Sequence, residues 1–189
     1  TGSSKSMTGL GYRKRIQLEY LRIYFNQCMC MTDSDHQKFM ATAIALSEEA
    51  MRSGRGGPYG AVVVKEGEII GQGMNEVTSV NDPTAHAEMT AIRQACEQVG
   101  HWNLSGCELY TSCEPCPMCL GAIYWARLDK IYYGNTKEVA TQFGFNSQHF
   151  YDEVAKPCEE RQIKMLPLMP EVAVKAFEEW RNLSDKQPY

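Results

Sequence analysis

The sequence lacks any hydrophobic run long enough to cross a membrane. Its longest uninterrupted apolar stretches, such as residues 60–64, have the length of a single strand, whereas a membrane-spanning helix needs about 18 consecutive apolar residues. Internal repeats and low-complexity segments are also missing. With 43% hydrophobic and 22% charged residues, the composition excludes a disordered, collagen-like or coiled-coil chain. The 189 residues therefore predict one folded domain without a membrane partner.

Positive charge is scarce over most of the chain. Residues 31–189 contain 14 Lys and Arg against 22 Asp and Glu, so the overall net charge of −4 conceals an acidic body. Residues 1–30 contain the other five basic residues and one acid, Glu19. Because nucleic-acid binding rests on Lys and Arg that displace counterions from phosphates, we expect a small neutral ligand rather than a nucleic-acid partner.

The cysteines are too few for a disulfide scaffold. There are eight in 189 residues, and no secretory signal is recognisable, because Lys, Arg and Glu interrupt the apolar runs near the start of the sequence. We therefore predict a reducing, cytoplasmic location, where clustered cysteines indicate a metal site.

The character of the chain changes abruptly at Met31. The basic and aromatic residues 1–30 are interpreted as a non-native or dispensable extension, with a short contact helix as the alternative. All recognisable chemical motifs follow Met31. We therefore expect a single functional domain over residues 31–189.

Hydrophobic periodicity after Met31 predicts alternating helices and strands. This order is typical of an α/β domain in which helices cover a mixed sheet. We expect a three-layer α/β/α sandwich with a five-stranded mixed sheet. The predicted helices are 33–54, 85–98, 114–127 and 172–181, and the predicted strands are 59–64, 68–73, 107–111, 130–134 and 163–168.

Two short motifs carry the candidate chemistry, His86-Ala87-Glu88 and Pro115-Cys116-Pro117-Met118-Cys119. Both fall at predicted helix N-termini, where unpaired N–H groups and the helix dipole favour thiolates. The two cysteines are three residues apart, so their sulfurs share one helix face and can bind one zinc ion at about 2.3 Å. His86 is the candidate third ligand.

Three protein ligands leave one position of a tetrahedral zinc ion open for water, as in catalytic sites. Glu88 lies two residues after His86, close to the metal but free to carry protons as general base and general acid. The alternative is a structural site in which Cys113 is the fourth ligand and Glu88 has no role. An H-x-E motif followed by P-C-x-x-C is typical of zinc deaminases, which favours the catalytic interpretation.

Through these motifs, the chain from residue 35 to 189 resembles the cytidine deaminase superfamily and, within it, the compact bacterial guanine deaminases. The segments 56–64, 81–88, 110–127 and 180–189 carry the resemblance. It implies the cytidine-deaminase-like fold, one Zn²⁺ per chain on His86, Cys116 and Cys119, and Glu88 as the proton shuttle. It also implies that Asn75 and the backbone N–H of Ala87 hold the substrate ring. Tyr59 stands where the family usually has a phenylalanine that packs against the base.

The same resemblance implies that Tyr189 reaches the pocket and that two chains pair as a homodimer with exchanged C-terminal segments. One departure concerns the substrate. After Gly144-Phe145 the family usually has acidic residues, whereas this chain has Asn146 and Ser147. Ser147 is thus a candidate substrate contact without the carboxylate that suits the adjacent N–H donors of guanine.

The predicted function is zinc-dependent hydrolytic deamination of a free nucleobase, first of all guanine to xanthine and ammonia. Cytosine, another aminated pyrimidine or triazine, or a nucleoside is the alternative substrate. Further alternatives are a tRNA adenosine deaminase, which the acidic body disfavours because base extrusion needs a basic channel, and a zinc-binding module without activity.

Overall fold

The computed structural model describes residues 31–188, which divide into two compact units. The first ends at Ser147 and the second begins at Gln148. The predicted extension 1–30 and Tyr189 lie outside the described residues. The units are described separately below, and the single domain over residues 31–189 stays a prediction.

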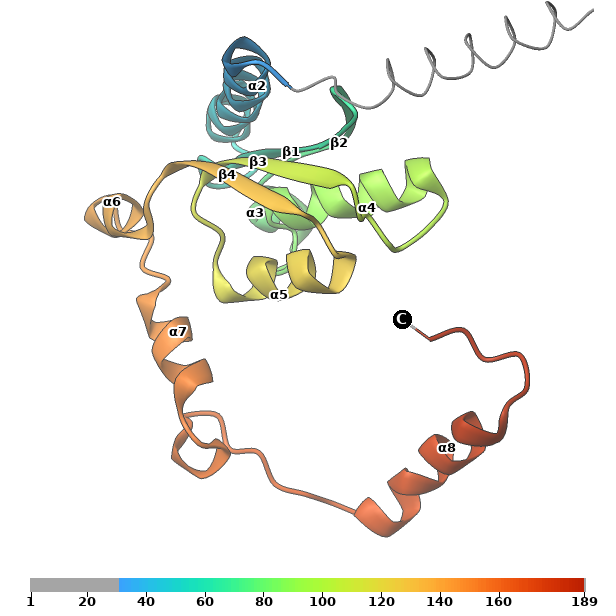
Figure 1. Ribbon diagram of the computed structural model, residues 1–189. Helices are drawn as coiled ribbons and strands as arrows, with labels where there is room; N and C mark the ends of the chain where they lie inside the picture. The colour runs from blue at the N-terminus through green and yellow to red at the C-terminus, as the bar shows by residue number, and fades with distance from the viewer. Residues whose placement is uncertain (1–30, 189) are drawn as a thin grey trace, which may run out of the picture. The chain divides into compact units, whose positions relative to one another are not determined.

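A four-stranded sheet forms the centre of the first unit, with the strand order β2-β1-β3-β4 (Figure 1). The central strand β1 (Gly60–Lys65) pairs antiparallel with both β2 (Glu68–Met74) and β3 (Cys107–Cys113). The last strand, β4 (Lys130–Asn135), runs parallel to β3. The sheet is therefore mixed, as predicted.

Helices cover both faces of this sheet, which confirms the three layers (Figure 1). On one face, α2 (Asp33–Arg52) packs Phe39 and Ala43 against Val62, Val64 and Tyr110. On the other face lie α4 (Ala87–Val99) and α5 (Pro117–Ala126). Their buried side chains meet those of β1 and β3, including Ala91, Ile123, Val63 and Leu109.

Glycines bring α4 unusually close to β2. A Cβ atom at Gly71 would lie 2.3 Å from the carbonyl oxygen of Ala91, and one at Gly73 would lie 2.3 Å from that of Ala87. No side chain fits in these gaps. The backbone of α4 thus rests directly on the strand, and this contact fixes where the helix begins.

The prediction of a fifth strand over residues 163–168 is wrong. The sheet in the described part of the chain has four strands, and residues 163–168 are irregular. Ile163, Leu166 and Leu168 are exposed, so no face is buried against a core. Pro167 has no N–H group for a strand ladder. An apolar sequence alone therefore did not specify a strand here.

Short helices account for the other differences from the prediction. The first unit also contains α3 (Val77–Val80) and α6 (Lys137–Gln142). The second unit contains α7 (Gln148–Ala155), the 3₁₀ turn η1 (Cys158–Glu160) and the predicted helix α8 (Pro170–Asn182). Within residues 31–188, none of the helices has the length and apolar content that a membrane-spanning segment requires.

Candidate zinc site

Two helix N-termini meet at the candidate site. His86 is the N-cap of α4 and Cys116 is the N-cap of α5, and both have extended backbone. Strand β3 leads into α5 through residues 114–116, and Pro117 occupies the first turn, where its missing N–H costs nothing. Cys119 and Glu88 follow in the first turns of their helices. The positive ends of both helix dipoles therefore point toward one small volume.

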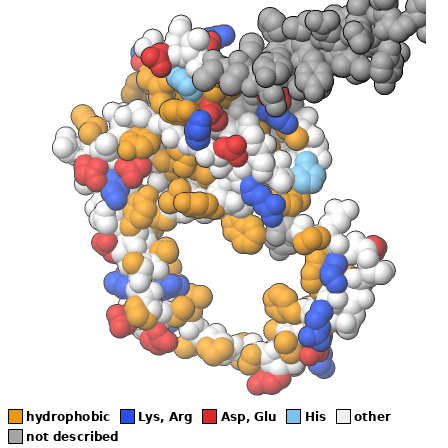
Figure 2. All heavy atoms as spheres, in the orientation of Figure 1, with side chains coloured by type: hydrophobic (Ala, Val, Ile, Leu, Met, Phe, Trp, Pro, Cys, Tyr) orange, Lys and Arg blue, Asp and Glu red, His pale blue; other side chains and the backbone are white. Residues whose placement is uncertain are grey.

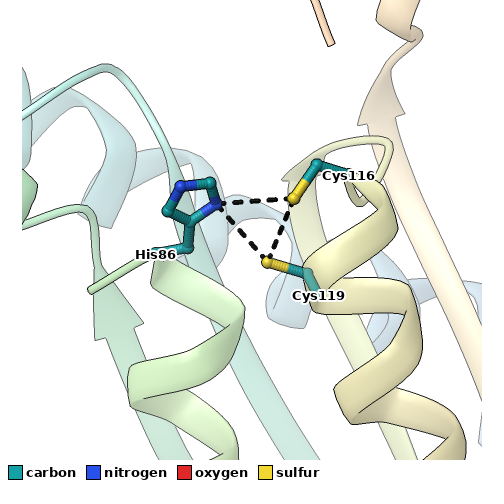
Figure 3. A group of neighbouring side chains, drawn as sticks. All are labelled: His86, Cys116 and Cys119. Atoms are coloured by element: carbon teal, nitrogen blue, oxygen red, sulfur yellow. Dashed lines mark hydrogen bonds between the residues drawn. The ribbon is translucent and has the colours of Figure 1, made fainter. Parts of the chain in front are cut away.

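The three predicted ligands point toward one another (Figure 3). Nδ1 of His86 lies 3.6 Å from Sγ of Cys116 and 3.5 Å from Sγ of Cys119, and the two sulfurs are 3.6 Å apart. A tetrahedral zinc ion with ordinary bond lengths holds sulfur and nitrogen ligands about 3.6 Å apart and two sulfurs about 3.8 Å apart. The donor set therefore fits zinc in spacing and in chemistry.

The two thiols differ in charge without a metal ion. The hydrogen bond with Cys119, supported by His86, lowers the pKa of the Cys116 thiol to about 4. The pKa of Cys119 is raised, because it shares its proton with Cys116 and is buried beside a second negative group. A bound divalent cation compensates two thiolates at once, so the site favours an ion of charge +2.

Glu88 is buried beside the sulfur of Cys119. Only 5% of the residue is exposed, and its Oε2 atom lies 3.5 Å from Sγ of Cys119. Burial is the main reason why the pKa of the Glu88 carboxyl is raised. A carboxyl group that takes up a proton readily, beside a metal site but not among its ligands, is suited to proton transfer.

Cys113 does not join this group. Its thiol is buried and donates to the backbone oxygen of Thr136 at 3.8 Å, and burial raises its pKa to about 11. The cluster of potential metal ligands consists of His86, Cys116 and Cys119. The geometry therefore favours three protein ligands over the structural four-ligand alternative.

Two predicted substrate contacts lie just after β2 and at the start of α4. Asn75 follows β2 and is buried, and its Oδ1 atom accepts hydrogen bonds from the N–H groups of Gly57 at 3.2 Å and Val77 at 3.3 Å. Its amide NH₂ group is therefore the part left for a ligand. Ala87 is the first residue of α4 and fully buried. A first-turn N–H has no partner within its own helix, so it suits a ligand.

Tyr59 and Ser147 lie on two loops that an aromatic contact connects. The half-buried ring of Tyr59 meets the ring of Phe145 edge to face, with centroids 5.3 Å apart. Ser147 follows two residues after Phe145 and is partly exposed. The sequence reasoning missed Phe145. The signal that could have found it is Gly144, which ends α6 just before it.

The zinc-binding region of cytidine and deoxycytidylate deaminases matches residues 33–135. The chain belongs to this family. It is also 48% identical over 155 residues to a guanine deaminase of Bacillus subtilis. This alignment covers 82% of this chain and 99% of that protein. The crystal structure of guanine deaminase from Bacillus subtilis superimposes with a TM-score of 0.79 at 49% identity, covering 98% of that chain. The cytidine-deaminase-like fold and zinc as the cofactor are thereby confirmed.

Other relatives match a smaller part of the chain. A tRNA-specific adenosine deaminase of Aquifex aeolicus is 44% identical over 95 residues, which is 50% of this chain and 62% of that protein. A structure of guanine deaminase from Nitrosomonas europaea is 29% identical with a TM-score of 0.55, over 58% of this chain and 63% of that one. These matches are shorter than the Bacillus subtilis match, which covers 82% of this chain.

Zinc content tests the three-ligand site. Because Cys116 is a ligand and Cys113 is turned toward Thr136, we expect about one zinc ion per chain in the wild type and in Cys113→Ser, and at least about tenfold less in Cys116→Ser. Elemental analysis after gel filtration measures the ratio. Loss of zinc in Cys113→Ser would instead support the four-ligand structural site.

Proposed function

We propose that this protein is a zinc-dependent guanine deaminase, which hydrolyses guanine to xanthine and ammonia. The observation that carries the proposal is the similarity to the Bacillus subtilis guanine deaminase over 99% of the length of that protein. The convergent ligand set and the buried Glu88 supply the chemistry that such a reaction needs. An amidine-like ring carbon loses its amino group when water adds to it and the C–N bond breaks.

Glu88 is the proton carrier in this proposal. Zinc, when bound at His86, Cys116 and Cys119, supplies the Lewis acidity that makes water nucleophilic near neutral pH. The Glu88 carboxylate accepts the proton of the attacking water and passes it to a ring nitrogen. It then takes the second proton of that water from the new hydroxyl group on the ring carbon and gives it to the departing amine, which leaves as ammonia while the carbonyl group forms. The raised pKa of Glu88 suits both steps, because the group binds and releases a proton at moderate cost.

Asn75 and Ala87 orient the ring. The Oδ1 atom of Asn75 is held by two backbone N–H groups, so the side chain presents its NH₂ group to the substrate. Together with the N–H of Ala87, it offers only donors, and these fit the oxygen and nitrogen acceptors of a purine ring. The Tyr59 ring supplies an apolar wall against which a flat heterocycle packs.

Replacement of Glu88 by Gln tests the proton-transfer role. We expect ammonia release to fall by about 10²- to 10⁴-fold, because glutamine keeps the shape and hydrogen-bonding capacity but cannot carry the proton. Zinc content and the thermal unfolding midpoint serve as controls and should stay at wild-type values. Full activity of Glu88→Gln would remove Glu88 from the mechanism.

Asn146 and Ser147 keep a second substrate in consideration. Neither side chain can supply a carboxylate to the adjacent N–H donors of guanine. Cytosine, another aminated pyrimidine or triazine, or a nucleoside is therefore the alternative substrate. A tRNA substrate is disfavoured, because residues 31–189 carry an excess of acidic residues. Ammonia release from guanine, adenine, cytosine, ammeline and the nucleosides compares these substrates directly.

A carboxylate introduced at position 147 tests the substrate assignment. If the pocket is an altered guanine site, Ser147→Asp should raise kcat/KM for guanine by about tenfold, the value of one charge-assisted hydrogen bond. Ser105→Asp is the matched control, since Ser105 lies just before β3 begins whereas the metal site lies beyond its end. Unchanged or lower guanine turnover in Ser147→Asp would contradict the account.

We also propose that two chains form a homodimer with exchanged C-terminal segments. None of residues 148–188, the described part of the second unit, is buried, and hydrophobic side chains lie uncovered along it in Figure 2. In the first unit, Tyr124 and Trp125 on α5 are 76% and 66% exposed. Such apolar surfaces are rarely left open to water. The cytoplasmic location remains part of the proposal, and it is supported by the free thiols of all cysteines in residues 31–188.

Light scattering and complementation test the exchange. We expect a mass of about twice the 21.4 kDa of one chain. A Glu88→Gln chain and a chain without Tyr189 are then co-expressed. If segments exchange, the intact Glu88 of one chain receives Tyr189 from the other and part of the activity returns. A monomeric mass would exclude the dimer, and a dimer without complementation would exclude the exchange.

A further inference from the structure

The end of α6 sets the direction of Phe145. The N–H of Gly144 donates to the carbonyl of Thr141 at 3.0 Å, and the N–H of Phe145 donates to the carbonyl of Ala140 at 3.1 Å. Gly144 has a φ of +90°, which a side chain would strain. These two bonds with a left-handed glycine form a Schellman motif, which stops a helix and fixes the residue after the glycine. Phe145 therefore leaves α6 in a defined direction.

Phe145 then packs into a small aromatic corner. Its ring meets that of Tyr59 at 88°, with centroids 5.3 Å apart, an arrangement that aromatic pairs prefer. Gly57 completes the corner, because a Cβ there would lie 3.2 Å from the Tyr59 ring and 3.3 Å from the Phe145 ring. Phe143, two residues earlier, is 77% exposed, whereas Phe145 is 41% exposed. Only one of the two phenylalanines thus takes part in the corner.

This corner adjoins the metal site on two sides. The Gly57 N–H donates to Oδ1 of Asn75, the side chain that is proposed to hold the substrate ring. The N–H of Asn75 in turn donates to the carbonyl of Tyr59 at 3.0 Å. Tyr59 thus contacts Asn75 through its backbone and Phe145 through its ring. Any shift of Phe145 would also shift residues 146 and 147, which follow it directly.

We propose that Phe145 is a positioning residue that anchors residues 146–147 beside the metal site through its contact with Tyr59. The identity of the substrate in this inference rests on the proposed function. The contact between Phe145 and Tyr59 rests on the structure alone. Phe145 touches neither a metal ligand nor Glu88 in the contacts that define the corner. It acts on specificity through the segment that carries Ser147.

Hydrogen exchange tests the anchor without any substrate. In the zinc-loaded protein, Phe145→Ala should raise the exchange rates of the amides of residues 143–148 by about 2- to 12-fold, the loss expected for one aromatic pair. Phe143→Ala removes a ring of the same size from the same turn and should leave these rates within about twofold. Equal exchange in the two variants would overturn the proposal.

Kinetics test the consequence for the substrate. With the base that the wild type deaminates, guanine first, Phe145→Ala should raise KM by about 2- to 12-fold while kcat changes less, because loosened contacts weaken binding in both ground and transition states. Phe145→Tyr keeps the ring and should restore KM. If Phe145→Ala does not fold, Phe145→Leu replaces it. An unchanged KM in a folded variant with wild-type zinc content would overturn the proposal.

These two measurements also separate the inference from the proposed function. If the wild type deaminates another base and not guanine, the proposed function fails, but the exchange result and the KM for the actual substrate still decide the role of Phe145. If guanine is the substrate and both Phe145→Ala readouts match those of Phe143→Ala, only the anchor fails.

Discussion

The close contact between α4 and β2 is the constraint on which the site depends. Gly71 and Gly73 let the helix backbone lie directly on the strand, where a Cβ atom would come within 2.3 Å of a helix carbonyl. This contact fixes where α4 begins, with the candidate metal ligand His86 as its N-cap and the proposed proton carrier Glu88 in its first turn. Helix α5 begins close to this point, because β3 ends at Cys113 and the chain reaches the N-cap Cys116 three residues later. Two helix N-termini can therefore serve one ion.

The electrostatics of the site follow from that arrangement. Two thiolates and a carboxylate in a buried space would repel one another strongly. The hydrogen bonds with Cys119 and His86 reduce this cost for Cys116, whose pKa falls to about 4, but the pKa values of Cys119 and Glu88 remain raised. A bound divalent cation compensates the negative charge that these groups would otherwise bring together. The protein thus builds a site that is electrostatically incomplete until it binds its metal.

The zinc site could be predicted well from the sequence, because its residues lie in two short motifs. Cys116 and Cys119 share one helix face through their spacing alone, and the His86-Ala87-Glu88 motif lies at a recognisable helix start. The fifth strand failed because a strand needs a partner, and no pattern within residues 163–168 states whether one exists. The contact between Tyr59 and Phe145 was equally invisible, since 86 positions separate the two rings. Short helices such as α6 were missed because their caps, not their periodicity, define them.

The residues proposed for the reaction lie on helices that pack against the sheet, whereas those proposed for substrate specificity at positions 146 and 147 lie on a loop. The ligands and Glu88 sit on α4 and α5, whose positions follow from buried contacts with the sheet. Asn146 and Ser147 lie beyond the end of α6 and directly follow Phe145, which a glycine turn and an aromatic contact position. We expect a substitution at position 146 or 147 to cost less stability than one in the core, because these loop residues are not buried. The substrate can thus change while the zinc chemistry is retained. The neutral side chains at these two positions are confined to the loop and are compatible with an unaltered metal centre.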